Sequence, residues 1–361
     1  MDKTPLFKFP SIGQFNQTVT DMKKMCVEET IVFNGSVKLH GTNAAIGYSE
    51  KHDLWCQSHK QIITEEKDNY KFAQWVNTKK KNIINFIKKL ADFYEIDLTE
   101  NAIIIYGEYC GSKIQKNVAI SGLDTMLVIF DVATASYEDC SKDEEVYLKW
   151  FDIGICDVPF PNNIYIYNIK QFNTYKIEVN LNNINLVKNK LIELTNKVEN
   201  ECPVGKYFGR ILGKDCTTGE GIVWRYSYKL DNGYSKIFRF KVKGDKHATS
   251  KVTTMTGVNV EKINNINKFV ELSVTENRLN QGISEIYGDE EPNNSWFNKI
   301  GKFNQWVVHD VKKEDMGAFP FIEDYEGKNG EEKQKEIIKM LNKNITEKCS
   351  KWLRLYIKSK L

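Results

Sequence analysis

The sequence predicts an α/β (α+β) protein that ends in a helical region. Up to about residue 245, short apolar runs bounded by glycine or polar residues alternate with a few segments of helical periodicity. Beyond that point the spacing of the apolar residues is mostly helical. A chain of 361 residues can hold a catalytic domain of roughly 200–250 residues and a smaller second domain. We therefore expect one domain over residues 1–248 and a helical domain over residues 249–361.

The composition is that of a folded intracellular protein. Apolar residues make up 41% of the chain and aromatic residues 12%, which is enough for a hydrophobic core and excludes a disordered chain. The formal charge of only +3 excludes a uniformly basic nucleic-acid coat. The longest apolar runs, such as residues 126–130, are far shorter than the roughly 18 residues of a membrane helix. Because the sequence also shows no secretory signal and no C-x-x-C pair among its eight cysteines, we expect a cytoplasmic or nuclear protein with no membrane partner.

The elements of the first half follow from periodicity and turn residues. Residues 37–48 predict a strand, a turn and a second strand, because apolar residues surround the glycine and asparagine of the turn. Apolar residues recur at a period near 3.6 over residues 69–94, which predicts a helix. Residues 103–106 and 127–132 are short apolar runs that predict two buried strands.

The later elements follow from the same signals. Apolar residues keep helical spacing over residues 184–198. Residues 221–226 and 237–242 predict a strand pair joined by a turn at residues 231–233. The last helix is predicted around residues 338–356. Residues 331–361 hold nine Lys/Arg against four Glu, so this helix presents either a solvated charged face or a surface that contacts phosphates.

Lysines at strand ends are the first candidate functional residues. Lys38 is followed by the conformationally permissive Gly41, an arrangement that can present an amine to a phosphate but that also recurs by chance. Lys241 and Lys243 alternate with apolar residues and share one face of a strand. A lysine is a poor nucleophile at neutral pH because its reference pKa is about 10.4, and nearby positive charge lowers that pKa. Several lysines on one face make chemical sense where an anionic phosphate lies between them.

Acidic and aromatic residues mark the ends of the other predicted strands. Glu108 comes just after one apolar strand, Glu220 comes just before another, and Phe130 and Asp131 close a third. Carboxylates suit Mg²⁺ or ribose hydroxyls, and an aromatic ring can stack on a purine. Other interpretations stay open: Glu108 and Glu220 can be salt-bridge partners of surface lysines, and Phe130 can be a core residue.

In chain order, these segments resemble the motifs of the covalent nucleotidyltransferase superfamily of polynucleotide ligases and mRNA-capping enzymes. Residues 38–43, Lys-Leu-His-Gly-Thr-Asn, are similar to the K-x-H-G-[ST]-N motif of RNA ligases related to RNA ligase 2. The resemblance covers roughly residues 30–245 and is specific as a set of five motifs. DNA ligases and capping enzymes usually carry Asp where His40 stands.

The resemblance implies a fold, an activity and partners. The fold is a nucleotidyltransferase domain, with an ATP-grasp-like ligase core, built of antiparallel sheets with flanking helices. The helical C-terminal domain follows it as a candidate RNA-binding part. The activity is that of an ATP-dependent RNA ligase with Mg²⁺ (or Mn²⁺) as cofactor. The partners are ATP and the RNA ends of a nicked duplex or a broken RNA.

The resemblance also assigns residue roles. Lys38 would carry the AMP, and His40 would contact the adenylate or the RNA 5′-phosphate. Glu108 would contact the ribose and Glu220 the metal, and both carboxylates are candidate metal ligands. The lysines of residues 241–243 would contact the phosphates. The nucleotide-binding set as a whole is Lys38, Leu39, Gly41, Asn43, Glu108, Phe130, Glu220, Lys241 and Lys243.

Alternative functions stay open on the sequence. A DNA ligase or an mRNA-capping guanylyltransferase belongs to the same superfamily, but His40 and the helical C-terminal domain argue against both. An inactive fold that binds RNA is the third interpretation. Residues 58–61, Ser-His-Lys-Gln, favour it, because the family pattern has a basic residue and then an arginine where His59 and Gln61 stand. In the C-terminal domain, Arg278 either reaches RNA or forms a salt bridge within the helices.

Overall fold

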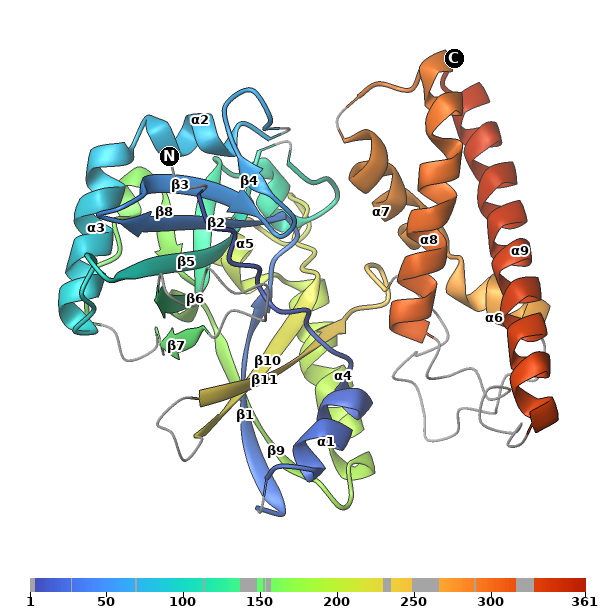
Figure 1. The fold of residues 1–361 in the computed structure, drawn as a ribbon, viewed down its shortest axis with the longest axis horizontal. Helices are drawn as coiled ribbons and strands as arrows, with labels where there is room; N and C mark the ends of the chain where they lie inside the picture. The colour runs from blue at the N-terminus through green and yellow to red at the C-terminus, as the bar shows by residue number, and fades with distance from the viewer. Residues whose placement is uncertain are drawn as a thin grey trace. The chain divides into compact units, whose positions relative to one another are not determined.

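Two units make up the chain, Met1–Gly244 and Asp245–Leu361. This computed structural model describes residues 4–26, 28–68, 70–112, 114–136, 148–151, 153, 157–229, 235–248, 266–288, 290–315 and 328–361. Among these residues, the strands lie in the first unit, and the regular elements of the second unit are helices (Figure 1).

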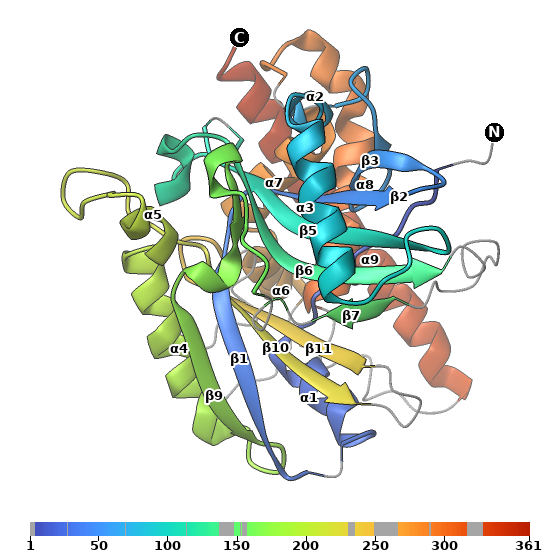
Figure 2. The ribbon, with the colours of Figure 1, turned by 90° about the vertical axis from the view of Figure 1, so that its left-hand side faces the viewer.

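Two β-sheets form the centre of the first unit (Figure 1, Figure 2). The four-stranded sheet has the order β11-β10-β1-β9, and the seven-stranded sheet has the order β4-β3-β2-β5-β6-β7 with β8 paired to β6. The named strands pair antiparallel, apart from the parallel pair of β6 and β8. The predicted antiparallel sheets with flanking helices are thus confirmed. The strands are β1 Thr30–Lys38, β2 Thr42–Ser49, β3 Asp53–Ser58, β4 Ile62–Ile63, β5 Asn101–Cys110, β6 Met126–Ser136, β7 Lys149–Phe151, β8 Ile166–Asn168, β9 Thr174–Asn180, β10 Gly221–Lys229 and β11 Ser235–Lys243.

The two faces of the four-stranded sheet differ in chemistry, because side chains alternate along each strand. One face is apolar, and its Phe240 ring packs against Phe33, Trp224 and Phe15 of helix α1. The residues of opposite parity on β1, β10 and β11 include six cations, namely Lys38, Arg225, Lys229, Arg239, Lys241 and Lys243.

A buried ion-pair cluster joins this charged face to the seven-stranded sheet. Asp131 of β6 lies 2.9 Å from Arg239 and 3.3 Å from Arg225. The Arg239 guanidinium also lies over the rings of Phe9 and Trp150, at 4.9 Å and 4.5 Å from their centroids. The charged face of the four-stranded sheet is therefore turned toward the seven-stranded sheet.

Helices flank both sheets (Figure 2). Helix α4 packs along β9, β10 and β11, and α1 packs against β11. Helix α3 lies on the face of the seven-stranded sheet that is turned away from the four-stranded sheet. The Nζ atom of Lys88 in α3 lies 5.9 Å from the centroid of the Tyr48 ring. Tyr48 and Ala45 lie on opposite faces of β2, because side chains alternate along a strand. Ala45 is on the face toward the four-stranded sheet, since it pairs with Tyr106, which in turn pairs with Asp131. The helices of this unit are α1 Phe15–Lys23, α2 Phe72–Asn77, α3 Lys80–Phe93, η1 Ala119–Gly122, η3 Asn162–Ile164, η4 Ile169–Gln171, α4 Asn185–Asn200 and α5 Pro203–Tyr207.

Two predicted elements differ from the observed ones. The single helix expected over residues 69–94 is the pair α2 and α3, because the Thr78 hydroxyl donates to the Trp75 carbonyl and closes the first helix. The strand-turn-strand expected over residues 37–48 exists, but β1 and β2 belong to different sheets. The short segment that follows Lys38 therefore crosses from one sheet to the other.

Strands β5 and β6 are longer than the apolar runs that predicted them. Glu108, Phe130 and Asp131 consequently lie inside strands and not at their ends, which corrects the prediction. A β-bulge explains why the pattern breaks at Phe130: the partners of β5 step from Asp131 to Ile129, so Phe130 is the extra residue. The predicted turn at residues 231–233 lies outside the described residues, whereas β10 and β11 on either side of it pair as expected.

The second unit is a group of helices around its own hydrophobic core. The core includes Leu341, Ile345, Cys349, Leu353 and Ile357, which recur every four residues along α9 and confirm the predicted last helix. The helices are α6 Ile266–Ser273, α7 Glu276–Tyr287, η5 Asn294–Lys299, α8 Ile300–Asp315 and α9 Lys328–Lys358.

Arg278 of α7 is an internal ion-pair residue of this unit. Its side chain is fully buried and lies 2.8 Å from Asp310 and 2.6 Å from Asp315. The alternative of a surface arginine that reaches RNA is therefore wrong, and the salt-bridge alternative is confirmed.

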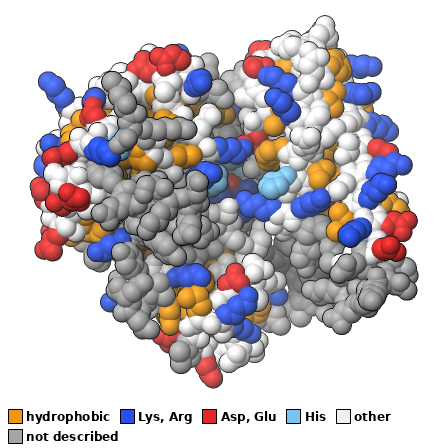
Figure 3. All heavy atoms as spheres, viewed as in Figure 1, with side chains coloured by type: hydrophobic (Ala, Val, Ile, Leu, Met, Phe, Trp, Pro, Cys, Tyr) orange, Lys and Arg blue, Asp and Glu red, His pale blue; other side chains and the backbone are white. Residues whose placement is uncertain are grey.

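The outer face of α9 is basic. Exposed lysines and an arginine follow the helix on the side away from the core, and Figure 3 shows blue side chains gathered over it. The exposed cations within α9 include Lys335, Lys339, Lys343, Lys351, Arg354 and Lys358. Within the described part of the chain, no helix has both the length and the apolar character that a membrane span requires. An RNA-binding role for this unit stays a prediction.

Candidate active site

Lys38 stands at the end of β1, in a row of residues that crosses three strands. It pairs with Gly221 of β10, and Gly221 pairs with Lys243 of β11. Residues directly opposite one another on neighbouring strands share a face of the sheet. The two lysines therefore lie on the same face with a glycine between them, and Lys241 shares that face two residues earlier on β11.

Only glycine fits at position 221. Its φ of +153° is a conformation that other residues rarely adopt, and a Cβ there would lie 2.0 Å from the carbonyl oxygen of Val242. This glycine sets the direction in which the chain enters β10, and hence the position of the residue just before it, Glu220.

The Glu220 carboxylate is the centre of the site. Its Oε2 atom lies 2.8 Å from Lys38 Nζ and 3.4 Å from His40 Nδ1, and its Oε1 atom lies 3.1 Å from Lys243 Nζ. Glu220 is only 3% exposed. Lys38 and His40 from one segment and Lys243 from a distant one thus meet at one buried carboxylate.

The charge state of Glu220 follows from these contacts. Burial disfavours its ionised form, but the positive charges of Lys38 and Lys243, together with the hydrogen bond from His40, outweigh burial and hold the pKa of Glu220 well below its ordinary value. Glu220 is therefore a carboxylate at neutral pH and holds the two lysine side chains together.

Gly41 and Glu108 connect the crossing segment to the seven-stranded sheet. The backbone N–H of Gly41 donates to Glu108 Oε1 at 2.8 Å. A Cβ at position 41 would lie 2.5 Å from the Tyr109 carbonyl oxygen and 2.7 Å from Cys110 Cβ, so the close approach to β5 requires glycine. This explains on physical grounds why a glycine follows the lysine at this spacing.

Glu108 differs from Glu220 in its proton affinity. Burial raises the pKa of Glu108 to about 6, because the opposing effects of Lys38, the Gly41 N–H and His40 are smaller and the nearby Glu220 charge adds to the rise. Glu108 is therefore a half-buried acid, and the neighbouring positive charges and hydrogen bonds only partly stabilise its ionised form.

The remaining predicted residues lie around this centre. The Leu39 carbonyl oxygen accepts from Lys38 Nζ at 3.4 Å, and its side chain is buried. Asn43 of β2 pairs with Glu108 of β5 and therefore shares its face of the seven-stranded sheet. Lys241 is half-buried on the charged face. The nucleotide-binding roles assigned to these residues stay predictions.

Phe130 lies at the bulge of β6. Its ring is half-buried and meets the ring of Phe9 edge-on, with 5.1 Å between the centroids. The sequence left two expectations for Phe130: a core aromatic, or an aromatic that stacks on a base. They differ in whether a ligand contacts the outer side of the ring. The contact with Phe9 fixes one side of the ring, and stacking on a purine stays a prediction.

Two supporting features were missed by the sequence analysis. The ion pairs of Asp131 with Arg225 and Arg239 hold the two sheets together beside the site. The sequence did hold a signal for the arginine: Arg239, Lys241 and Lys243 occupy alternate positions of β11 and so share one face of the sheet. The N-terminal segment is the other feature: Gly13 bridges to Phe240 of β11 as a parallel partner, and no local pattern pointed to this pairing.

Residues 58–61 form the turn between β3 and β4. The Ser58 hydroxyl accepts from the backbone N–H groups of Lys60 and Gln61, both at 3.2 Å. The departures from the family pattern at His59 and Gln61 thus fall in a well-bonded turn.

The donor set suits a divalent cation shared with a ligand. Among the described residues, no group of three or more His, Cys, Asp and Glu side chains could hold a metal by itself. Mg²⁺ is commonly held by one or two carboxylates together with substrate phosphates. Glu108 and Glu220 supply two carboxylates that influence each other electrostatically. A nearby cation would stabilise the ionised form of Glu108, which burial and the Glu220 charge disfavour.

Comparison with known proteins assigns the chain. Residues 32–243 match the family described as RNA ligase. No curated protein sequence matches the chain. Among solved structures, a Naegleria gruberi RNA ligase with PPi is similar over 68% of this chain and 60% of its own, with 14% identity and a TM-score of 0.38. A lysine-to-alanine variant of the Naegleria gruberi enzyme with ATP and Mn covers 68% of this chain and 59% of its own, with 12% identity and a TM-score of 0.38.

The family match spans more than half of the chain, and both of its ends lie at or near residues of the candidate site. It starts in β1, shortly before Lys38, and stops at Lys243. Every charged group gathered at Glu220 lies within it. The chain belongs to the RNA ligase family.

Proposed function

We propose that this protein is an ATP-dependent RNA ligase that joins a 3′-hydroxyl and a 5′-phosphate RNA end through a lysyl-AMP intermediate. The observation that carries the proposal is the convergence of Lys38, His40 and Lys243 on the buried carboxylate of Glu220. A structural ion pair needs one cation for one carboxylate. The additional cations on this face suit a polyanionic ligand such as the triphosphate of ATP.

In the first step, Lys38 acts as the nucleophile. Its neutral Nζ attacks the α-phosphorus of ATP, a nitrogen–phosphorus bond forms, and the bond between the α-phosphorus and the bridging oxygen breaks. Pyrophosphate leaves, Nζ releases one proton to solvent, and AMP stays bound to Nζ as a phosphoramidate.

Glu220 controls when Lys38 becomes nucleophilic. A carboxylate 2.8 Å from the amine favours the ammonium form, so the resting ion pair holds Lys38 in place but unreactive. A divalent cation held by Glu220 and Glu108 would withdraw this carboxylate charge from Lys38 and neutralise charge on the phosphates. Lys241 and Lys243 lie on the same face and would stabilise charge that develops at the α-phosphate.

The second and third steps transfer AMP and seal the RNA. An oxygen of the RNA 5′-phosphate attacks the adenylate phosphorus, the bond to Nζ breaks, Nζ takes up a proton from solvent and leaves as the free amine, and an RNA-adenylate forms. The 3′-hydroxyl of the other end then attacks the activated 5′-phosphate, loses its proton and expels AMP. His40, which is one-third exposed beside Glu220, is the residue we assign to the contact with the RNA 5′-phosphate.

Covalent labelling tests the proposal. The protein is incubated with α-labelled ATP or GTP and Mg²⁺ and then denatured, and the polypeptide is examined for label. We expect label from ATP, loss of that label in Lys38→Ala, and retention in Lys176→Ala, an exposed lysine of β9 that serves as the matched control. A Lys38→Ala protein that still carries label refutes the assignment of the nucleophile.

The same experiment separates the alternatives. Label from GTP alone indicates a capping guanylyltransferase, and a folded protein labelled by neither nucleotide indicates an RNA-binding module. If ATP labels the protein, sealing is compared on nicked duplexes with RNA or DNA at the 3′-hydroxyl side. Equal rates on an all-DNA nick indicate a DNA ligase.

A further inference from the structure

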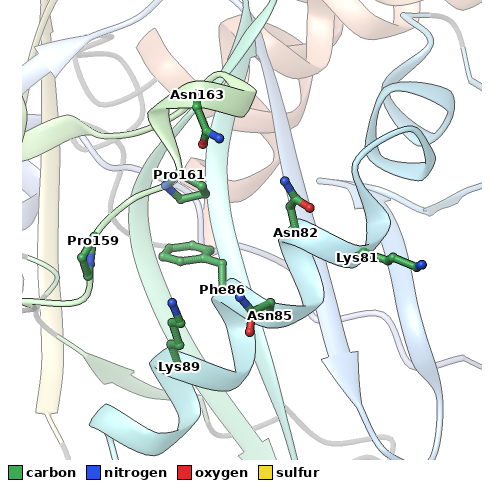
Figure 4. Close-up of a pocket in the computed structure, with 8 residues that line it drawn as sticks. All are labelled: Lys81, Asn82, Asn85, Phe86, Lys89, Pro159, Pro161 and Asn163. Atoms are coloured by element: carbon green, nitrogen blue, oxygen red, sulfur yellow. The ribbon is translucent and has the colours of Figure 1, made fainter.

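A lysine- and asparagine-rich groove runs beside α3 in the first unit (Figure 4). One wall is the outer face of the helix, with Lys81, Asn82, Asn85 and Lys89. The other wall comes from the segment with Pro159 and Pro161. The cavity has a volume of about 340 Å³, comparable to a nucleotide-sized ligand.

The groove continues past the start of the helix. A second hollow of about 290 Å³ shares Lys81 and Asn82 with the first and is also lined by Lys79 and Lys80. In Figure 4 the Lys81 side chain points away from the proline wall, toward the start of the helix. No Asp or Glu lines either hollow among the described residues.

The local charge is concentrated in sequence as well as in space. Residues 71–91 contain six lysines and no Asp or Glu, although the whole chain carries only +3. Lys80 is paired with Asp53 at 2.6 Å, but both side chains are largely exposed, so the pair is weak. Lys81 and Lys89 are exposed on the groove and have no ion pair within the described residues.

The groove is a formed feature of the unit. The Phe86 ring of α3 packs against Phe160, between the two prolines, with ring centroids 5.0 Å apart. This contact fastens the proline segment to the helix. In Figure 4, Asn163 lies beyond the proline wall with its amide directed toward the helix. The walls are therefore held apart at a set spacing.

We propose that this groove binds the phosphate backbone of the RNA substrate, away from the ends that are joined. The proposal rests on the proposed function. Lysine ammonium groups neutralise phosphates, asparagine amides donate to phosphate or sugar oxygens, and such contacts position a nucleic acid without reading its sequence. The groove shares no residue with the Glu220 centre.

Polynucleotide fits this groove better than an acidic protein segment. The lysines run from Lys79, which immediately precedes α3, to Lys89 within it, and a helix advances about 1.5 Å per residue, so the cationic wall is about 15 Å long. A nucleic-acid strand places one phosphate about every 3.4 Å in duplex form, so several phosphates can lie along it. The flexible amides on the wall can serve either a phosphate or a base edge.

The position of the groove makes a prediction about RNA length. Helix α3 lies on the face of the seven-stranded sheet turned away from the charged face. One sheet and one helix, each about 10 Å thick, separate the groove from the candidate active site. At the rise of about 3.4 Å per nucleotide of a stacked strand, about six nucleotides span this distance.

Binding and labelling measured side by side test the proposal. The Lys81→Gln/Lys89→Gln variant is compared with Lys176→Gln/Lys188→Gln, which removes two lysines of the same unit outside the groove. Fluorescence anisotropy measures binding of a labelled RNA of about 20 nucleotides, without ATP, over a series of salt concentrations. We expect the groove variant to bind about tenfold more weakly, with the salt slope reduced by about one per lysine, and the control variant to bind as wild type does.

Each outcome decides the question. Equal losses in both variants, or no loss in the groove variant, overturn the proposal. If poly-glutamate displaces the labelled RNA as effectively as unlabelled RNA of the same charge does, the proposal is overturned in favour of an acidic protein partner. Label transfer from ATP to Lys38 should be unchanged in the groove variant. If wild type itself takes no label, the proposed function fails while the anisotropy comparison still reports on the groove.

Discussion

The Nζ atom of Lys38 lies 2.8 Å from Oε2 of Glu220, although 182 positions separate the two residues in the chain. The contact depends on the pairing of β1 with β10, which brings Lys38 opposite the glycine that follows Glu220. Lys243 completes the arrangement from the third strand of the row. Because Glu220 stays ionised and buried, it holds two like charges together at a place where a polyphosphate would need both.

Replacement of Gly41 should impair the site without unfolding the protein. In Gly41→Ala, the new Cβ would press on the Tyr109 carbonyl, move the crossing segment away from β5 and lengthen the hydrogen bond to Glu108. A displacement of this kind near a nucleophile reduces rates by about 100-fold, and we expect that loss in the rate of labelling by ATP. Circular dichroism should show unchanged secondary structure.

Gly301→Ala is the matched control for this change. No heavy atom lies within 4 Å of the position of its added Cβ, so labelling should match wild type. If Gly41→Ala is labelled as fast as Gly301→Ala, the close approach to β5 has no role in the reaction.

The raised pKa of Glu108 predicts a pH-dependent stability difference. The ordinary value is 4.5 and the folded value is about 6, so the folded protein binds this proton more tightly than the unfolded chain does. The contribution of Glu108 to stability is therefore present below pH 4.5 and lost as the pH rises to about 6. Glu108→Gln keeps an acceptor for the Gly41 N–H but cannot ionise.

Thermal unfolding over a pH series measures this effect. Relative to wild type, Glu108→Gln should gain in Tm as the pH rises from 4.5 to about 6, keep that gain above it, and show no gain at lower pH. Glu178→Gln, on an exposed position of β9, is the control and should change Tm little. A Glu108→Gln protein that is less stable than wild type at neutral pH contradicts the assignment.

Removal of the Asp131 charge should destabilise the first unit. Asp131→Asn leaves the guanidinium groups of Arg225 and Arg239 without their shared carboxylate, and Arg239 is buried. Breaking a buried pair on one side lowers the free energy of unfolding by about 3 kcal/mol. Urea denaturation measures this difference.

The control for the buried pair is an exposed one. Asp21 lies 3.4 Å from Lys24 on the surface of α1, so Asp21→Asn should change the free energy of unfolding by less than about 0.5 kcal/mol. Similar losses from the two substitutions would show that the Asp131 cluster does not hold the sheets together.

Local patterns in the sequence were sufficient to predict the main helices and strands from the spacing of their apolar residues. The alternation of Phe240 and Val242 with Lys241 and Lys243 correctly placed the lysines on one face, because side-chain parity is a property of the strand itself. The glycine of residues 38–43 was correctly singled out as well. The strand limits around Glu108 and Phe130 were wrong, because a bulge and pairing with neighbouring strands extend β5 and β6 past their apolar runs.

The sequence by itself determined the candidate site residues, their order and the strand face that the lysines share, since residue type and strand parity are local properties. Only the tertiary structure decided that Lys38, His40 and Lys243 meet at Glu220 rather than at Glu108, and that Asp131 ties the two sheets together. The physical reason is that strand order and sheet facing depend on contacts between segments far apart in the chain. Burial disfavours the ionised form of both glutamates, and only the contacts of Glu220 with Lys38, Lys243 and His40 reverse the direction of its pKa shift.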